Sequence, residues 1–358
     1  MSQIDRADRV AARLAGSELD LLLVTDALNL RYLTGFTGSN GLAIVGADTR
    51  RFLTDFRYVE RARSEVTGFH LQAAPQELRT ALSEGWPPGG LRLGFEDQHV
   101  SVRRHAELRE TVPDRIELVP GGGLVEAERA IKEPEEIAAI RAGATLVDEI
   151  YAWLAGQGLV GRTERAVALA LEQEMRLRGA DGPSFSSIVA AGQNGALPHA
   201  TPRDVAIAPD TLVTLDIGAR IDGYCSDCTR TWATGQLDDD LSELYETVLR
   251  AQQSALAAVR PGPEGRAVDA IARDLIAAAG HGEHFGHGLG HGVGLDIHEA
   301  PRLSRTAEGR LAAGHVVTVE PGIYLPGRGG ARIEDLVVVT EDGHEVLSRT
   351  SKELTVVA

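Results

Sequence analysis

The sequence predicts a two-domain protein, with an α/β domain first and a second domain of mixed helices and strands. Its 358 residues are too many for one ordinary hydrophobic core and suit two domains. Short apolar runs alternate with amphipathic segments up to about residue 120, which is typical of an α/β domain. Further along the chain one six-residue strand pattern occurs twice, and this repeat indicates two related halves that face one site.

The first domain is predicted from its apolar runs, each of which is short enough for a single strand. Gly46-Ala47-Asp48 reads as a hairpin turn between two of these strands. The predicted strands cover residues 19–25, 41–46, 50–55, 91–96 and 115–120. The amphipathic segments at 56–66, 75–84 and 101–110 are predicted to be helices.

The segment Pro120–Gly123 is the clearest linker candidate, because proline and consecutive glycines do not continue a helix or strand. We therefore expect the first domain to span residues 1–123 and the second 124–358. A long helix is predicted from Pro134, since apolar residues recur near every 3.6 positions and proline suits a first helical turn. The second domain is also predicted to contain helices at 163–178, 239–259 and 265–279 and strands at 211–219, 223–233, 315–324 and 331–340.

The chain is acidic, with 36 basic and 52 acidic side chains and a net charge of −16. Such a chain is poorly suited to binding nucleic acid or an anionic membrane surface by charge. No window reaches the roughly 18 apolar residues of a membrane helix, and residues 5–9 are charged where a signal peptide would be apolar. With only Cys225 and Cys228 the chain has no disulfide framework, so we expect a cytoplasmic protein.

The repeated strand pattern carries an acid at the same place in each copy. Val213–Gly218 reads VTLDIG and Val317–Gly322 reads VTVEPG, which agree in residue type at five of six positions. Asp216 and Glu320 are the shared acids. Each copy is followed by a turn and a second strand that bears another acid, so the repeat predicts two similar hairpins.

The two hairpins are predicted to place these acids in pairs. Asp216 and Asp227 are equidistant from a turn near residues 221–222, so their carboxylates are expected to lie opposite each other. Glu320 and Glu334 have the same relation to the turn of the second hairpin. Like charges directly opposed are destabilising, which indicates a cation between them. The alternative is that each acid is solvated or pairs with a nearby arginine: Arg220, Arg230 or Arg332.

A histidine-rich segment lies between the hairpins, with five of the chain's eleven histidines in residues 281–298. His287 and His291 have the spacing of a helical zinc site, but glycine at every second position of 286–294 argues against a helix. We expect a loop whose backbone closely approaches another group, the alternative being a flexible surface loop. Four carboxylates and one imidazole suit two divalent ions, and oxygen-rich ligands favour Mn²⁺ or Co²⁺, with Zn²⁺ as an alternative.

Sequence blocks over nearly the whole chain resemble the Xaa-Pro peptidases, prolidase and aminopeptidase P, within the pita-bread metallopeptidases. The blocks RYLTGFTGSNG and LTDFRYVERA are similar to a creatinase-type N-terminal domain. LPHATP, TLDIGARIDGYCSDCTRT, GHGLGHGVGLDIHE, VTVEPGIY and ARIEDLVVVTEDG follow in the family's order. The resemblance implies a creatinase-type α/β domain at 1–123 and a pita-bread catalytic domain, α+β with pseudo-twofold symmetry, at 124–358.

The same resemblance implies roles for individual residues. Arg302, four residues after His298, stands where some prolidases carry an arginine for the substrate's C-terminal carboxylate. Five residues correspond to the family's metal ligands: Asp216, Asp227, His291, Glu320 and Glu334. The residues that correspond to its catalytic group are His199, His287, His298, Glu320 and Arg332. Because no ligand position is substituted, a relative that only binds metal is disfavoured.

By resemblance, the chain is expected to hydrolyse the Xaa-Pro bond of small peptides with proline in second position, using two divalent ions to activate water. The resemblance favours Xaa-Pro dipeptides as the substrates. The alternatives are an aminopeptidase P acting on longer peptides, a hydrolase of another small amide, and a non-catalytic metal-binding scaffold. A homodimer is also implied. Cys225 and Cys228 are predicted to be packing residues, since positions i and i+3 of a strand point to opposite faces.

Overall fold

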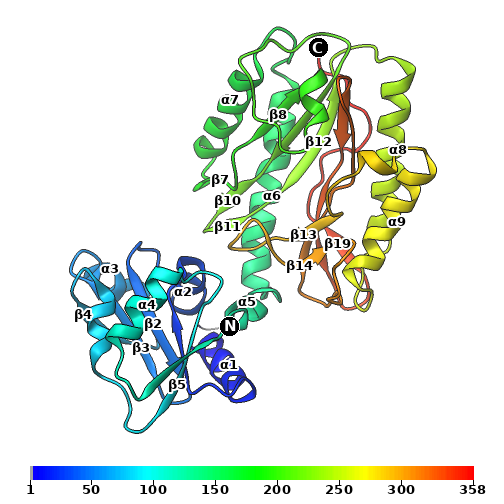
Figure 1. The fold of residues 1–358 in the computed structure, drawn as a ribbon. Coiled ribbons are helices and arrows are strands. Elements are labelled where there is room, and N and C mark those ends of the chain that lie inside the picture. The colour runs from blue at the N-terminus through cyan, green and yellow to red at the C-terminus, as the bar shows by residue number, and fades with distance from the viewer. Residues whose placement is uncertain (1–2) are drawn as a thin grey trace. The chain divides into compact units, whose positions relative to one another are not determined.

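The computed structural model describes residues 3–358, which form two compact units, one ending at Arg129 and one beginning at Ala130 (Figure 1). The first unit contains a six-stranded mixed sheet in the order β4-β3-β2-β1-β5-β6. Strand β1 pairs antiparallel with β2 and parallel with β5. The strands are β1 (Leu21–Val24), β2 (Gly41–Gly46), β3 (Arg50–Asp55), β4 (His70–Ala74), β5 (Leu91–Phe95) and β6 (Ile116–Pro120).

Helices surround this sheet, and the five predicted strands and the α/β class are confirmed. Segment 75–84, predicted to be a helix, contains only the 3₁₀-helix η1. The sequence analysis did not identify α1, α2, β4 or α5. Asp26 begins α2, because its carboxylate accepts hydrogen bonds from two backbone amides of the first turn. The helices are α1 (Gln3–Gly16), α2 (Ala27–Thr34), α3 (Val59–Glu65), η1 (Leu78–Ser83), α4 (Val102–Thr111) and α5 (Leu124–Arg129).

The glycine segment predicted to be a linker is held within the first unit. The Gly121 amide donates to the Phe95 carbonyl at 2.9 Å, and the Gly122 amide donates to the Asp97 carboxylate at 2.7 Å. Helix α5 follows this segment, and the division between the units comes after α5, at Arg129.

The helices of the second unit agree closely with the sequence pattern. Helix α6 begins at Pro134, and Glu133 and Glu136 form a reciprocal capping box at its first turn. The unit's helices are α6 (Pro134–Ala155), α7 (Glu164–Leu177), α8 (Asp239–Leu256), α9 (Gly265–Ala278) and the 3₁₀-helices η2 (Gly192–Ala196) and η3 (Gly282–His284).

Two sheets, each packed against a pair of helices, form the centres of the two halves of the second unit (Figure 1). One has the order β12-β9-β8 and shares a buried apolar core with α6 and α7. The other has the order β14-β13-β15-β18-β19, and its core is shared with α8 and α9. The strands are β7 (Gly182–Pro183), β8 (Ile188–Ala191), β9 (Leu212–Ile217), β10 (Ala219–Ile221), β11 (Tyr224–Cys225), β12 (Cys228–Ala233), β13 (Gly290–Gly292), β14 (Glu299–Leu303), β15 (Val316–Val319), β16 (Gly322–Leu325), β17 (Gly329–Arg332), β18 (Asp335–Val339) and β19 (His344–Val346).

The register of the first hairpin differs from the prediction. Asp216 pairs with Thr229 across β9 and β12, so it does not lie opposite Asp227. The turn is one position later than expected, because Asp222 and Gly223 both have positive φ and join Ile221 to its partner Tyr224. This geometry is typical of a two-residue hairpin turn, for which Asp-Gly is a favoured sequence.

The second hairpin has the predicted register. Val319 pairs with Asp335 and Gly322 with Arg332, an alignment that also places Glu320 opposite Glu334. Each long strand predicted for this hairpin is interrupted at its acid, so that β15 and β16 are separate, as are β17 and β18. Glu320 and Glu334 therefore lie between strands and outside the regular pairing of either sheet.

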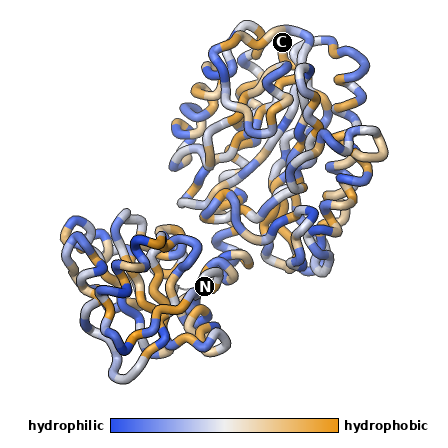
Figure 2. Tube along the Cα trace, in the orientation of Figure 1, coloured by the Kyte–Doolittle hydropathy of each residue, from blue (hydrophilic) through white to orange (hydrophobic). Residues whose placement is uncertain are grey.

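Figure 2 shows hydrophobic residues gathered along the strands inside each unit, in agreement with the buried apolar clusters. Among the described residues, no helix is both long enough and apolar enough to span a membrane.

Candidate metal centre and active site

A cavity of about 520 Å³ in the second unit brings the predicted site residues together. Its lining comes from both halves of the unit, and it includes every residue that the sequence analysis selected: His199, Asp216, Asp227, His287, His291, His298, Arg302, Glu320, Arg332 and Glu334. Residues from distant parts of the sequence therefore share one cavity.

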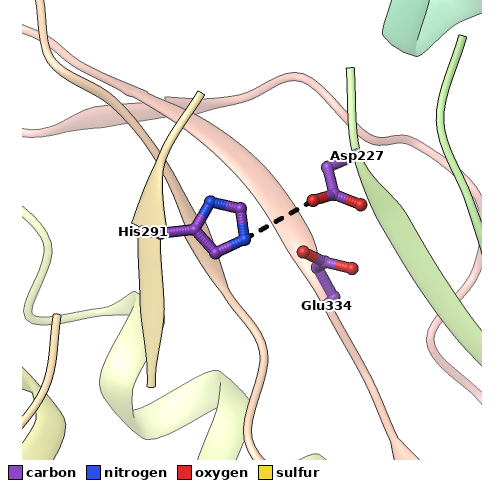
Figure 3. A group of neighbouring side chains, drawn as sticks. All are labelled: Asp227, His291 and Glu334. Carbon is purple, nitrogen blue, oxygen red and sulfur yellow. Dashed lines mark ion pairs between the residues drawn. The ribbon is translucent and has the colours of Figure 1, made fainter. Parts of the chain in front are cut away.

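The centre of the site is a buried group of two acids and a histidine, shown in Figure 3. One potential ligand atom from each of Asp227, His291 and Glu334 lies within 4.8 Å of the others. The His291 Nε2 atom is 3.6 Å from Asp227 Oδ2 and 3.2 Å from Glu320 Oε1. These acids come from β-hairpins and the histidine from the glycine-rich segment, as predicted.

The ring of His291 is oriented by the backbone carbonyl of the next residue. Its Nδ1 atom lies 3.1 Å from the Gly292 carbonyl oxygen, which can only accept a hydrogen bond, so Nδ1 carries the proton. The Nε2 lone pair then points toward the carboxylate oxygens. A cation between Nε2 and these oxygens, either a proton or a metal ion, makes the contact favourable, and a proton there lets His291 donate to Glu320. This orientation is common for metal-ligating histidines.

Two carboxylate oxygens of the site have no hydrogen-bond donor among the described residues. They are Asp216 Oδ1 and Glu334 Oε1, and both are buried. Burial raises the pKa of Asp227 well above its usual value, and the charges of Glu334 and Asp216 raise it further. Buried acids of this kind bind a cation favourably, because it offsets both desolvation and mutual repulsion. The residues present therefore fit a divalent metal.

Glu320 differs from the other acids of the group. Burial alone would raise its pKa, but the hydrogen bond and charge of His291, together with His287 and Arg332, lower it to about 2. The Thr318 hydroxyl also donates to Glu320 Oε1 at 2.9 Å. Glu320 is therefore a carboxylate, and not a carboxylic acid, at neutral pH.

Arg332 joins two sides of the cavity. Its guanidinium is buried and donates to Asp216 Oδ2 at 2.7 Å, to the Tyr324 hydroxyl at 2.9 Å and to the Pro198 carbonyl at 3.1 Å. The expectation that an arginine could pair with one of the acids thus holds for Asp216. Arg230 pairs instead with Asp335, beside the cluster.

His287 is held by protein groups at both ring nitrogens. Nδ1 lies 2.8 Å from the Gly288 carbonyl, and Nε2 lies 2.8 Å from the Tyr324 hydroxyl. Burial lowers the pKa of His287 and raises that of Tyr324 to about 12, so Tyr324 retains its proton and donates it to Nε2. The sequence analysis missed Tyr324, although it ends the block VTVEPGIY.

His298, His199 and Arg302 are on the solvent side of the cavity, where their side chains are exposed. The His298 ring is 4.4 Å from that of His291, and its partial burial, together with the nearby positive groups, lowers its pKa. Arg302 makes no ion pair with any described residue. Its cation therefore faces the cavity without a protein counter-ion.

The loop that carries His199 is fastened by a buried acid that the sequence analysis also missed. Glu164, at the start of α7, accepts a hydrogen bond from the Ala191 amide at 2.9 Å and another from the Asn194 side chain at 2.9 Å. Arg203 donates to both oxygens of the same carboxylate. Glu164 thereby holds the chain on both sides of His199.

An α/β unit followed by two similar hairpin halves, which close on buried acids and one histidine, defines a class of metal-dependent hydrolases. The chain belongs to metallopeptidase family M24, whose model matches residues 137–341. A creatinase/prolidase N-terminal domain matches residues 6–131. The protein is an enzyme of this family, and its site is suited to a divalent metal.

Individual relatives agree over almost the whole chain. It is 43% identical to a Xaa-Pro dipeptidase of Pyrococcus furiosus, over 98% of this chain and 99% of the relative. A solved Xaa-Pro dipeptidase from Bacillus anthracis matches with a TM-score of 0.95 and 36% identity, covering 99% of this chain and 100% of that one. An X-Pro aminopeptidase structure from Thermotoga maritima matches with a TM-score of 0.87 and 32% identity, over 97% of this chain and 99% of that one.

Proposed function

We propose that the protein is a prolidase, an enzyme that hydrolyses the Xaa-Pro bond of dipeptides. The observation that carries this proposal is the unpaired cation of Arg302 on the rim of a cavity whose second lining arginine, Arg332, already pairs with Asp216. A dipeptide has a carboxylate one residue after the scissile bond, and such a cation can bind it. The dipeptidase names of close relatives support the same substrate class.

Five residues are proposed to hold two divalent ions, Mn²⁺ in preference to Co²⁺ or Zn²⁺: Asp216, Asp227, His291, Glu320 and Glu334. Two doubly charged ions would balance four carboxylates, and oxygen ligands predominate in the set. When bound, such ions supply Lewis acidity for activating water and polarising the scissile carbonyl.

Side chains of the cavity are proposed to carry out proton transfer, charge stabilisation and positioning. Glu320 is ionised at neutral pH and is proposed to accept the proton of the attacking water. His298 is exposed to the cavity and is proposed to donate a hydrogen bond to the oxygen that gains charge at the scissile carbonyl. His199 is proposed to orient the substrate. His287 and Arg332, whose polar atoms already have protein partners, are proposed to keep Asp216 and the loop before His199 in place.

Proline selectivity has a chemical basis in the substrate. The bond before proline is a tertiary amide without an N–H, and the ring fixes φ, so the substrate is rigid at this residue.

The main competing function is that of an aminopeptidase P, which removes the first residue of longer Xaa-Pro peptides; the Thermotoga maritima structure is named as an X-Pro aminopeptidase. A hydrolase of another small amide and a non-catalytic scaffold are less favoured candidates. We further propose that the protein is cytoplasmic, consistent with its two free cysteines, and that it forms a homodimer, as the family resemblance implies.

The substrate proposal is tested by comparing Xaa-Pro, Xaa-Pro-Yaa and a non-proline dipeptide under defined metals. We expect the Xaa-Pro dipeptide to be hydrolysed best. Arg302→Ala should raise KM for the dipeptide about tenfold or more, because a charge-assisted hydrogen bond is lost, and should affect the tripeptide less. Arg305→Ala is the control, since this exposed arginine is outside the lining of the cavity.

Each competing function predicts a different result. Preferred hydrolysis of the tripeptide would favour aminopeptidase P, and equal losses on both substrates would remove the role of Arg302. Equal turnover of the non-proline dipeptide would indicate a broader amidase. No hydrolysis with any metal would favour the scaffold.

A further inference from the structure

The glycine-rich loop between η3 and β13 carries His287 and leads directly to His291 on β13, yet it has few side chains with which to pack. Residues 286–290 alternate glycine with His287 and Leu289. Glycine costs more conformational entropy to order than any other residue. Some other part of the protein must therefore hold this backbone if His287 and His291 are to keep fixed positions.

An ion pair on α9 makes those contacts. Asp269 and Arg273 are one helical turn apart, and their side chains form two hydrogen bonds of 2.7 Å. Arg273 also donates to the Phe285 carbonyl at 2.9 Å and to the His287 carbonyl at 2.8 Å. Asp269 Oδ1 accepts from the Leu289 amide at 3.0 Å. The pair thus binds the loop backbone at three alternate residues.

The surroundings of this pair make it rigid. The Asp269 side chain is 1% exposed and that of Arg273 is 12% exposed. The Arg273 guanidinium also stacks over the Phe285 ring, with its carbon 4.1 Å from the ring centroid. A planar guanidinium can donate to a carboxylate and two carbonyls at once, whereas a lysine ammonium cannot reproduce this fork.

We propose that Asp269 and Arg273 are positioning residues for the hydrolytic reaction, which act through His287 and His291 without touching substrate. The proposal rests on the function proposed above. It predicts that the ion pair sets both the rate of the reaction and the affinity of the site for metal. The reason is that His291 lies two residues after Leu289, the last residue that the pair binds. An ion pair that served only to stabilise α9 would affect neither quantity.

Arg273→Lys is the decisive variant, with Arg178→Lys as its matched control. Arg178 pairs with Glu174 on α7 at the same four-residue spacing, with side chains 29% and 22% exposed. We expect Arg273→Lys to lower kcat about ten- to a hundredfold at saturating Mn²⁺, because small misplacements of reacting groups are costly. We also expect weaker Mn²⁺ binding to the apoprotein, by about tenfold or more, in calorimetric titration. Arg178→Lys should change neither.

Unchanged kcat and Mn²⁺ affinity in folded Arg273→Lys would overturn the proposal, even if its melting temperature fell. If this variant does not fold, Asp269→Asn decides by the same two measurements, since it keeps an acceptor for the Leu289 amide but loses the charge. Hydrogen exchange of the wild-type protein provides a test without mutation. The Leu289 amide should exchange slowly, because it donates to Asp269. Rapid exchange would contradict the proposed hold of the ion pair on the loop, even if the wild type proved to have no prolidase activity.

Discussion

Asp216 uses its two carboxylate oxygens for different purposes. Oδ2 accepts a hydrogen bond from Arg332, which fixes the orientation of the carboxylate, while Oδ1 is buried without a partner among the described residues. Burial raises the pKa of Asp216, but the neighbouring Arg332 opposes this effect. An acid that is both oriented and left with one unpaired oxygen is prepared to bind a cation.

His315 makes folding stability dependent on pH at a place away from the acids. It is buried, and its Nδ1 atom accepts a hydrogen bond from the Ala312 amide at 3.1 Å. Burial, together with nearby Lys132, lowers its pKa from 6.5 to about 4. Between these values the unfolded chain binds a proton that the folded chain does not. Stability is therefore full above pH 6.5 and falls as the pH drops toward 4, by about 3 kcal/mol at 1.4 kcal/mol per pKa unit.

His315→Asn should remove this component of the pH dependence, since the asparagine oxygen can accept the same amide without binding a proton. Urea unfolding at several pH values from 7 to 4 measures it. The slope of unfolding free energy against pH is compared between wild type and variant. Exposed His70 provides the control, and His70→Asn should retain the wild-type slope. The same dependence of unfolding free energy on pH in the wild type and in His315→Asn would contradict the prediction.

Single residues were predictable from sequence where their chemistry is carried by a local motif. The acids and histidines belong to blocks such as GHGLGHGVGLDIHE, and all of them line the cavity. Tyr324, Glu164 and Arg273 were missed, because each acts through hydrogen-bond partners from other segments of the chain. Arg273, for example, matters through carbonyls of the loop at Phe285 and His287, and carbonyls leave no trace in the sequence pattern.

At the level of elements, the two hairpins show that the position of the turn sets the register of the paired strands. The second hairpin was predicted correctly because its loop is centred on Gly327, which adopts a positive φ. The first was misplaced because Asp222-Gly223 was not recognised as a two-residue turn. The interruptions of the strands at Glu320 and Glu334 were also missed, since apolar alternation continues through them.

The close approach of β13 and β14 gives an element-level prediction. A side chain at Gly292 would place its Cβ atom 2.2 Å from the Ala300 carbonyl oxygen, so the two strands could not keep their separation. Gly292→Ala should cost about 1–3 kcal/mol of unfolding free energy and displace adjacent His291, with loss of activity. Urea unfolding and steady-state kinetics measure the two effects.

Gly286→Ala is the control for this substitution in the same glycine-rich segment. An added Cβ there meets no atom within 4 Å. Its stability should stay close to that of the wild type. A Gly292→Ala protein with normal stability and activity would show that β13 and β14 can separate without consequence.

For the whole molecule, metal removal should affect the two units differently. The candidate ligands all belong to the unit that begins at Ala130, where four acids repel one another without a cation. Metal at about 100 times its Kd adds about 2.7 kcal/mol to stability. A chelator should therefore lower the melting temperature of this unit by about 5–10 °C and leave that of the first unit unchanged.

Differential scanning calorimetry with and without chelator measures this shift. Asp227→Asn supplies the control, because a protein that no longer binds metal well should be insensitive to the chelator. A second-unit transition that ignores the chelator in the wild type would contradict the metal assignment, and equal shifts in both units would contradict its location.

The division of acids between the hairpins also decides when such a centre can form. Each half of the second unit supplies two carboxylates, Asp216 with Asp227 and Glu320 with Glu334, and only the later half supplies His291. Neither half holds the complete set, so the centre can form only after both halves have folded against each other.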